Sequence, residues 1–234
     1  MSGVLYGIGV GPGDPELVTL KAVRIMAGAP VIAYPTTEEG ESMVRAIAAP
    51  HLPDGRIEIA VRTPIGRGPA AAEAVYDGYA AEIARHLDAG RDVAFLCQGD
   101  PFVYGSFAYL HGRLAARHTT RVVPGVSSLG AVAAAAGVPL VRGYEVLNVV
   151  PAPLPEAELE ARLGAGDAVA VIKVGRHLAK VRRVIRRLGL MASAVYVERA
   201  TMKGERVLTL ARVRRASAPY FSMIVVPGNG GRSG

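Results

Sequence analysis

The sequence predicts an α/β fold with two α/β domains, in which an open parallel sheet is followed by a mixed sheet. In the first half, short apolar strands alternate with segments of helical periodicity, a pattern typical of βαβ units and a parallel sheet. In the second half, helices separate only the first three strands, so the later strands are expected to pair antiparallel. The length of 234 residues favours two modest cores, and we expect domains at residues 1–122 and 123–234.

The elements of the first domain follow from apolar runs and helix signals. Strands are expected at residues 4–10, 31–34, 57–61, 93–96 and 121–123. Asp14 as N-cap and Pro15 at the first helical position predict the start of the first helix. A second helix is expected over residues 70–89, and its apolar face is formed by Val75, Tyr79, Ile83 and Leu87. A third helix, after the fourth strand, is expected to turn inward Phe107, Leu110 and Leu114.

The second domain has a different pattern of strands and helices. Its strands are expected at residues 147–150, 168–174, 194–198, 207–210 and 221–226, and residues 228–234 are expected to fray. Helices are expected at 156–163 and at 176–188. The second of these has an apolar face formed by Leu178, Val181, Ile185 and Leu188. Its cations lie elsewhere on the helix, as in any amphipathic helix, and are Lys180, Arg182, Arg183, Arg186 and Arg187.

Composition limits the class of protein. The net charge of +7 suits an anionic partner as well as an ordinary solvated surface. The longest nearly apolar stretch, residues 129–141, is too short to span a bilayer, and the chain enters a strand without a basic leader, so a cytoplasmic protein without a membrane partner is expected. A single cysteine, Cys97, excludes an internal disulfide and is expected to be a small buried residue. The five histidines have no metal-ligand spacing and are expected at the surface or at caps, so no metal site is predicted.

Several common motifs are absent. In a dinucleotide fingerprint counted from Gly7, the last glycine is replaced by Pro12, and counted from Gly9 it is replaced by Asp14. Neither a P-loop nor a G-x-S-x-G sequence occurs, and the adjacent Ser127 and Ser128 have no evident histidine partner. A basic nucleic-acid module would need a basic stripe with interleaved aromatics, but the chain has four Phe, no Trp and scattered arginines, so no nucleic-acid partner is expected.

Three loops at strand ends carry the strongest functional signal. The first strand ends in G-I-G-V-G-P-G-D, the fourth in C-Q-G-D-P-F-V-Y-G-S, and the fifth in P-G-V-S-S. Ligands of open parallel sheets bind at the carboxyl ends of the strands, so these loops predict one cleft with Asp100 in it. Alone, each sequence is also compatible with an ordinary turn.

These loops resemble those of the tetrapyrrole (corrin/porphyrin) methyltransferases that use S-adenosylmethionine, also called class III. The resemblance covers nearly the whole chain. Three later segments, I-K-V-G-R-H-L-A-K-V, V-Y-V-E-R-A-T-M and A-P-Y-F-S-M-I-V-V, are similar to the members that methylate precorrin-2 at meso carbon 20, giving precorrin-3A in cobalamin biosynthesis. The chain departs from the expected pattern at Gln98, where we expect Glu, and at Ile172, where we expect Met.

The resemblance implies a site and its ligands. S-adenosylmethionine is expected in a cleft between the two domains, against Pro12, Gly99, Asp100, Pro101, Val103, Tyr104, Ser127, Ser128, Val174 and Ala200. Val174 and Ala200 are expected to contact the adenosine end, mostly through their backbone. The other ligand implied is an anionic tetrapyrrole, which would give the excess of Arg and Lys a purpose, and the family usually forms homodimers. No residue is singled out as a general base.

Other acceptors stay open at this stage. Routes with early cobalt insertion use the cobalt-bearing analogue of precorrin-2, although the later segments favour the metal-free compound. Relatives within the superfamily act on another corrin carbon, on uroporphyrinogen, on the modified histidine of elongation factor 2, or on a ribosomal RNA ribose. A basic RNA-binding protein is the remote alternative.

Overall fold

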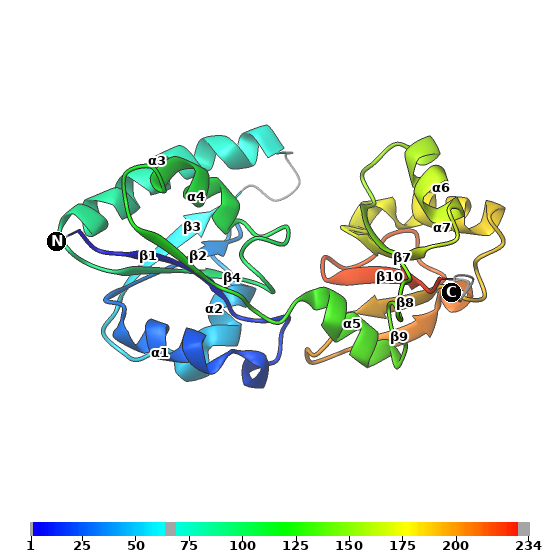
Figure 1. Cartoon of the computed structure of the whole chain (residues 1–234), viewed down its shortest axis with the longest axis horizontal. Coiled ribbons are helices and arrows are strands. Elements are labelled where there is room, and N and C mark those ends of the chain that lie inside the picture. The colour runs from blue at the N-terminus through cyan, green and yellow to red at the C-terminus, as the bar shows by residue number, and fades with distance from the viewer. Residues whose placement is uncertain (1, 64–68, 229–234) are drawn as a thin grey trace. The chain divides into compact units, whose positions relative to one another are not determined.

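The computed structural model describes residues 2–63 and 69–228 and divides the chain into two compact units (Figure 1). Unit 1 is Met1–Ser127 and unit 2 is Ser128–Gly234. Each unit is an α/β layer structure with its own sheet, as the sequence predicts. The expected fraying of residues 228–234 lies, apart from Gly228, outside the described residues.

The sheet of unit 1 has five strands, all parallel, which confirms the predicted open parallel sheet. They are β1 (Leu5–Gly9), β2 (Val31–Thr36), β3 (Ile57–Arg62), β4 (Val93–Cys97) and β5 (Thr120–Val123). Their order is β3-β2-β4-β1-β5, so Leu5 of β1 lies beside Val93 on one side and Thr120 on the other. This order places the loops that follow β4, β1 and β5 next to one another.

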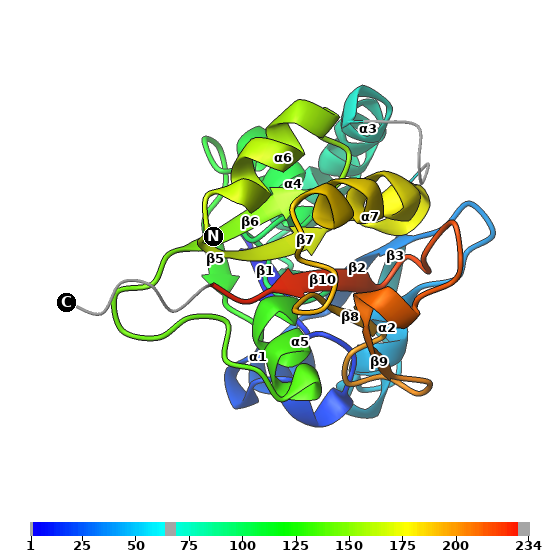
Figure 2. The ribbon, with the colours of Figure 1, turned by 90° about the vertical axis from the view of Figure 1, so that its right-hand side faces the viewer.

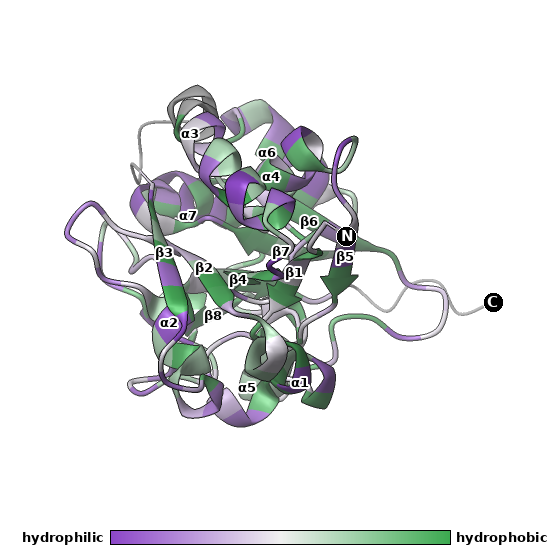
Figure 3. Ribbon diagram, turned by 90° about the vertical axis from the view of Figure 1, so that its left-hand side faces the viewer, coloured by the Kyte–Doolittle hydropathy of each residue, from purple (hydrophilic) through white to green (hydrophobic). Residues whose placement is uncertain are grey.

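Helices cover both faces of this sheet (Figure 1). On one face lie α1 (Leu20–Gly28) and α2 (Met43–Ala48), whose buried residues pack on Ile8, Ile32 and Leu96. On the other lie α3 (Pro69–Asp88) and α4 (Phe107–Leu114), which pack on Leu5 and Phe95. Figure 3 shows the central strands coloured as hydrophobic between these two helical layers. Helix α2, which is only six residues long, was not predicted from the sequence.

Two details of the predicted helices are corrected. Asp14 and Pro15 open only a three-residue 3₁₀ turn, η1 (Pro15–Leu17), because Val18 is extended. The α-helix starts at Leu20, where the hydroxyl of Thr19 accepts a hydrogen bond from the Ala22 N–H at 3.2 Å. In α4 the predicted inward residues are confirmed, since Phe107, Leu110 and Leu114 are all buried.

The buried face of α3 is also corrected. Ile83 and Leu87 are fully buried as predicted, but Val75 and Tyr79 are only half-buried. Tyr76 and Ala80 take their places against the sheet. A repeat of four residues drifts around a helix of 3.6 residues per turn, so the sheet-facing stripe moves to the neighbouring position over two turns.

Unit 2 contains a mixed sheet of five strands, as predicted (Figure 2). They are β6 (Leu147–Pro151), β7 (Ala168–Ile172), β8 (Val195–Glu198), β9 (Arg206–Thr209) and β10 (Ser222–Val226), in the order β6-β7-β10-β8-β9. β6 and β7 are parallel, whereas β10 runs antiparallel to both of its neighbours and β9 antiparallel to β8. β7 ends two residues earlier than expected because Lys173 has a left-handed backbone, with φ of 56°.

The helices of unit 2 also lie on two faces. α6 (Glu156–Gly164) and α7 (Leu178–Arg187) cover one face, and α5 (Ser128–Ala136) covers the other (Figure 2). Two short 3₁₀ turns complete the unit, η3 (Gly175–His177) before α7 and η4 (Leu210–Arg212) after β9. The predicted amphipathic face of α7 is confirmed, since Leu178, Val181 and Ile185 are fully buried.

One histidine does not fit the expectation of surface or cap positions. His118, in the short connection between α4 and β5, is 7% exposed. Its ring Nδ1 lies 3.8 Å from the carboxylate of Asp88 at the end of α3. Sequence spacing does not reveal this buried position. Among the described residues, no helix is both long and apolar enough to cross a membrane.

The corrected start of α1 gives a testable prediction. Thr19→Ala should lower the free energy of unfolding by about 1 kcal/mol, because it removes the hydroxyl that accepts from Ala22 N. Ser106→Ala is the control, since Ser106 stands at the start of α4 without a capping hydrogen bond. Urea unfolding followed by circular dichroism measures both. Equal losses in the two variants would contradict the assignment of Thr19 as the cap.

Candidate functional site

Backbone contacts join the three predicted loops at the carboxyl edge of the unit 1 sheet. Gly11, after β1, forms an isolated antiparallel bridge with Gly99, after β4, and the Gly99 N–H donates to the Gly11 carbonyl at 2.8 Å. The Val10 N–H donates to the Cys97 carbonyl at 2.9 Å. Hence the first two loops continue the pairing of β1 and β4 beyond the strands.

The third loop meets the other two through glycines. A Cβ atom on Gly125, after β5, would lie 2.0 Å from the Gly99 carbonyl oxygen, and one on Gly9 would lie 2.5 Å from the Gly125 nitrogen. Both distances are far below van der Waals contact, so only glycine fits where these backbones cross. The crossing brings the three loops into direct main-chain contact at the carboxyl ends of the strands, the edge of a parallel sheet where ligands bind.

The carboxylate of Asp100 connects two of these loops. Its Oδ1 accepts a hydrogen bond from the Phe102 N–H at 2.9 Å, and its Oδ2 accepts from the Gly125 N–H at 3.2 Å. The first bond shapes the G-D-P turn and the second links it to the loop after β5. Asp100 therefore lies where the sequence predicts, with a structural role that the sequence did not indicate.

Gln98 makes a third link between loops. Its side-chain amide Nε2 donates to the carbonyl oxygen of Pro12 at 3.0 Å. An ionised glutamate, the residue expected here from the family resemblance, has no donor for this bond. The departure from the expected pattern thus coincides with a contact that only the amide makes at neutral pH.

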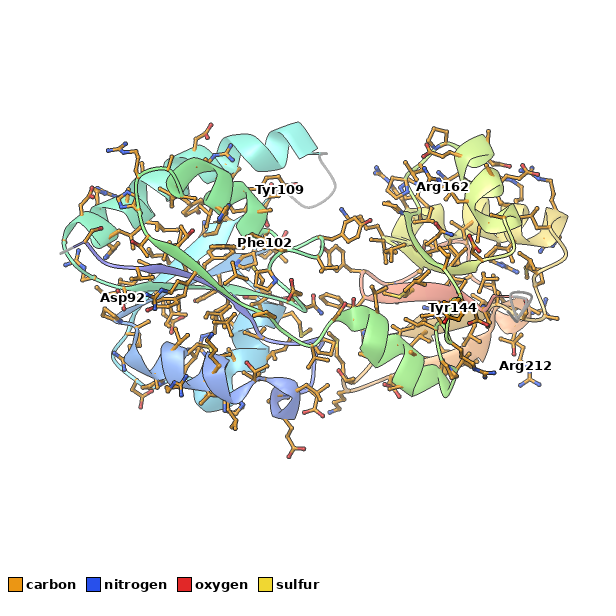
Figure 4. All side chains as sticks on the ribbon, in the orientation of Figure 1. Asp92, Phe102, Tyr109, Tyr144, Arg162 and Arg212 are labelled. Carbon is orange, nitrogen blue, oxygen red and sulfur yellow. The ribbon has the colours of Figure 1, made fainter. Side chains whose placement is uncertain are left out.

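The outer part of the loop after β4 presents apolar side chains. Phe102, Val103 and Tyr104 are 52%, 46% and 55% exposed. Phe102, labelled in Figure 4, is held edge-on against the His111 ring, with centroids 5.1 Å apart. Tyr104 has a left-handed backbone, with φ of 58°, a conformation that costs about 1 kcal/mol or more in a non-glycine residue and is typical of functional loops.

Seven of the predicted cofactor residues lie in these loops of unit 1: Pro12, Gly99, Asp100, Pro101, Val103, Tyr104 and Ser127. Cys97 lies directly beneath them at the end of β4, where it is buried as expected. Burial raises the pKa of its thiol to about 12, so Cys97 stays neutral and is not a nucleophile at physiological pH. In the described part of the chain, no cluster of His, Cys, Asp and Glu could hold a metal ion.

The remaining predicted residues belong to unit 2. Ser128 is the first residue of α5, whereas Val174 follows β7 and Ala200 follows β8, both buried. Because β7 and β8 are each antiparallel to β10, they point the same way and end at the same edge of the sheet. Val174 and Ala200 therefore stand on two loops at the same sheet edge, which follow strands on either side of β10.

The backbone at this edge is strained. Lys173, Arg199 and Thr201 all have positive φ, between 51° and 66°, although none is glycine. They flank Val174 and Ala200 in the chain. Such conformations persist only where surrounding contacts fix them, and they gather at ligand sites.

A buried carboxylate that sequence reasoning missed lies beside these loops. Glu198, the last residue of β8, is 4% exposed. Its Oε1 accepts hydrogen bonds from the Tyr196 hydroxyl at 2.6 Å and from Arg215 at 2.7 Å, and the Tyr196 hydroxyl is also 3.3 Å from Ser222 Oγ. Burial, with the hydrogen bond to Glu198, raises the pKa of Tyr196 to about 12. The one sequence signal is a Glu with a Tyr two residues earlier, which share one face of a strand.

Two arginines of α7 form ion pairs with acids of α6. Arg183 is 2.9 Å from Glu156, and Arg187 contacts Glu156 at 2.7 Å and Glu160 at 2.8 Å, all acids of α6. These two arginines stabilise the pairing of α6 with α7. Lys173 and Arg176 precede α7 and stand exposed at the strand-end edge, in the segment after β7.

The fold and these loops define a family. Residues 4–213 match the family of tetrapyrrole (corrin/porphyrin) methylases, and the chain belongs to it. Over 97% of its length it is 42% identical to a precorrin-2 C(20)-methyltransferase of Sinorhizobium, 98% of which is covered. It is 31% identical to a cobalt-precorrin-2 C(20)-methyltransferase of Salmonella typhimurium, with 97% of each chain covered.

Longer relatives and solved structures share this similarity. The chain is 45% identical to the cobalamin biosynthesis protein CobIJ of Mycobacterium tuberculosis over 97% of its own length, but it spans only 46% of that protein. A cobalt precorrin-4 methyltransferase has the same fold, with a TM-score of 0.73 at 23% identity and coverage of 96% and 94%. The uroporphyrin-III C-methyltransferase of Thermus thermophilus, solved with S-adenosylhomocysteine, gives 0.69 at 25% identity, with coverage of 96% and 92%.

The close contact of main chain at Gly125 predicts that one added methyl group lowers the stability of the chain strongly. Gly125→Ala should destabilise the chain by about 3 kcal/mol or more, because its Cβ would collide with the Gly99 carbonyl, as in other overpacked sites. Gly112→Ala, in α4, has open space around its Cβ and should be neutral or stabilising by up to about 1 kcal/mol. Thermal unfolding of both variants tests this. A Gly125→Ala variant as stable as Gly112→Ala would refute the close crossing.

Proposed function

We propose that the chain transfers a methyl group from S-adenosylmethionine to meso carbon 20 of precorrin-2, giving precorrin-3A in cobalamin biosynthesis. The observation that carries the proposal is the 42% identity to the Sinorhizobium enzyme over nearly the full length of both chains. The lower identity to the cobalt-precorrin-2 enzyme of Salmonella typhimurium supports the metal-free acceptor.

The residues of the strand-end loops fit S-adenosylmethionine. Where Gly9, Gly99 and Gly125 cross, three strand-end loops lie close together, so that one ligand can contact the main chain of all three. The loop residues proposed to hold it in unit 1 are Pro12, Gly99, Asp100, Pro101, Val103, Tyr104 and Ser127, with Ser128, Val174 and Ala200 in unit 2. The complex of the Thermus thermophilus relative with S-adenosylhomocysteine supports this assignment.

The methyl transfer requires the protein mainly to align the two reactants. When bound, S-adenosylmethionine supplies a sulfonium methyl group that is already electrophilic, and the meso carbon of a reduced tetrapyrrole is electron-rich. Holding two reactants in line and out of water can lower a barrier by about 7–11 kcal/mol. Asp100 contributes by fixing two loops, while Phe102 and Val103 present exposed apolar surface that a bound reactant could cover. No residue is assigned as a general base.

We also propose that the chain forms a homodimer in the cytoplasm. Exposed apolar side chains of unit 2 that such an interface could bury are Val141, Val146 and Tyr144, the last 87% exposed. Light scattering of the purified chain measures its mass. A monomer at micromolar concentration would contradict the dimer.

Turnover tests the function directly. The purified chain should methylate precorrin-2 with S-adenosylmethionine, adding the mass of one methyl group at carbon 20, and should turn over cobalt-precorrin-2 more slowly. Mass spectrometry and NMR of the product decide the position. Methylation at another carbon, or faster turnover of the cobalt compound, would overturn the proposed substrate.

Asp100 should affect both stability and cofactor binding. Asp100→Ala removes the acceptor of the Phe102 and Gly125 N–H groups and should weaken S-adenosylmethionine binding about tenfold or more. Asp92→Ala is the matched control, because Asp92 accepts from the Val4 N–H at 2.7 Å at the opposite end of β4 (Figure 4). Both variants should lose stability, but only the first should lose affinity in calorimetric titration. Equal affinities would remove Asp100 from the site.

Charge should govern binding of the acceptor, an octacarboxylate. Replacing Lys173 and Arg176 with Gln should weaken its binding and flatten the dependence on salt, because surface charges interact over a Debye length of about 8 Å at physiological ionic strength. Replacing Arg183 and Arg187 with Gln removes the same charge from residues already paired with acids of α6. Stopped-flow binding across a salt series compares the two double variants. A larger effect at Arg183 and Arg187 would place the carboxylates elsewhere.

A further inference from the structure

One segment of unit 2 contacts both loops that carry the proposed adenosine contacts. This connecting segment, residues 213–221, leads from η4 into β10. Its Ala218 N–H donates to the Gly175 carbonyl at 2.9 Å, and its Phe221 carbonyl accepts from the Arg199 N–H at 2.7 Å. Gly175 directly follows Val174, and Arg199 directly precedes Ala200. The connecting segment is thus bonded to the immediate neighbours of both residues.

The topology explains why these loops need a common support. β10 lies between β7 and β8, so the loops after β7 and β8 start on strands that are not paired with each other (Figure 2). The chain entering β10 passes at the same edge, because β10 runs antiparallel to both strands. Residues 213–221 therefore occupy the one position in the sheet order that is adjacent to both loops.

The strained backbone of the two loops requires such support. Lys173, Arg199 and Thr201 hold left-handed conformations that non-glycine residues leave unless their surroundings fix them. The two hydrogen bonds from the connecting segment fall within two residues of each of these positions. Losing them would let the loops relax to ordinary backbone and move Val174 and Ala200.

An ion pair anchors the connecting segment to the sheet. Arg215 donates to Glu198 Oε1 at 2.7 Å, and this carboxylate is buried while the arginine is 41% exposed. The Tyr196 hydroxyl donates to the same oxygen, so Glu198 is fixed from inside the core. A charge-assisted bond to a buried carboxylate is stronger and geometrically stricter than a surface ion pair. The weaker partner is Arg206, at 3.8 Å and half exposed.

We propose that Arg215 and Glu198 are positioning residues for cofactor binding: by anchoring residues 213–221, they hold the backbone of Val174 and Ala200 in the arrangement that receives the adenosine of S-adenosylmethionine. Neither side chain needs to touch the cofactor. The inference rests on the proposed function. It adds two residues, Arg215 and Glu198, that act on cofactor binding through the main chain of Val174 and Ala200.

The test compares two arginines that share one carboxylate. Arg215→Gln should raise the Kd and KM for S-adenosylmethionine about tenfold, with kcat at saturating cofactor changed less than about threefold, because displaced binding groups weaken affinity before chemistry. Arg206→Gln, which removes the same charge beside the same glutamate, should leave both within about twofold. Arg215→Lys keeps the charge and should recover part of the affinity. Hydrogen exchange of the Ala218 and Arg199 amides, which donate the two supporting bonds, should be faster in Arg215→Gln alone.

The outcomes separate this inference from the proposed function. If the wild-type chain binds S-adenosylmethionine and a folded Arg215→Gln variant binds it with equal affinity, the inference is overturned but the proposed function is not. Equal losses in Arg215→Gln and Arg206→Gln would do the same, since they would reflect net charge. A wild-type chain that binds no S-adenosylmethionine would overturn the proposed function, and with it the cofactor role of the anchor. Should Arg215→Gln not fold, Arg215→Lys provides the same comparison with a smaller change.

Discussion

Unit 1 depends on a place where three stretches of main chain cross without side chains between them. Gly9, Gly99 and Gly125 bring the ends of β1, β4 and β5 closer than any Cβ allows. The bridge from Gly11 to Gly99, the bond from Gln98 to Pro12 and the bond from Gly125 to Asp100 can form only because the loops start so close together. The strand order β4-β1-β5 sets up the crossing, and the glycines permit it.

The strand-end loops of unit 2 are held in place differently from those of unit 1. They are strained at non-glycine residues, and contacts made by side chains and by the connecting segment hold them. In unit 1, by comparison, main chain packs directly on main chain. The antiparallel β10 between β7 and β8 is what distinguishes this sheet from that of unit 1. The chain therefore fixes main chain at the carboxyl edges of its two sheets in two ways. Unit 1 uses glycine, and unit 2, under the proposal above, uses a buried glutamate.

The parts of the fold that could be predicted are those with a periodic signal. All ten strands lie close to their expected positions, because short apolar runs between turns are distinctive, and the mixed character of the second sheet followed from the absence of helices between its last strands. The six residues of α2 are too few for a period to show, and the true start of α1 depended on Thr19 rather than on the more obvious Asp14 and Pro15.

The candidate site also has a part that the sequence predicts and a part that it does not. The loops of unit 1 could be found because glycines, Asp100 and prolines follow apolar strands. The bond that links Asp100 to the third loop could not, because its donor, Gly125, is 25 residues away. Glu198 could not be found, since a glutamate at a strand end is usually solvated and its partner Arg215 stands 17 residues on. The roles of the ten predicted cofactor residues stay predictions that rest on family resemblance.

The amide of Gln98 has a consequence for the acid tolerance of the cofactor loops. Because an amide does not ionise, its bond to the Pro12 carbonyl keeps the same strength across the whole physiological pH range. A glutamate at this position could donate the same bond only when protonated, near or below a pKa of about 4.3, and at neutral pH its charge would face a carbonyl dipole. The chain thus links the ends of β1 and β4 with a contact that no proton can switch.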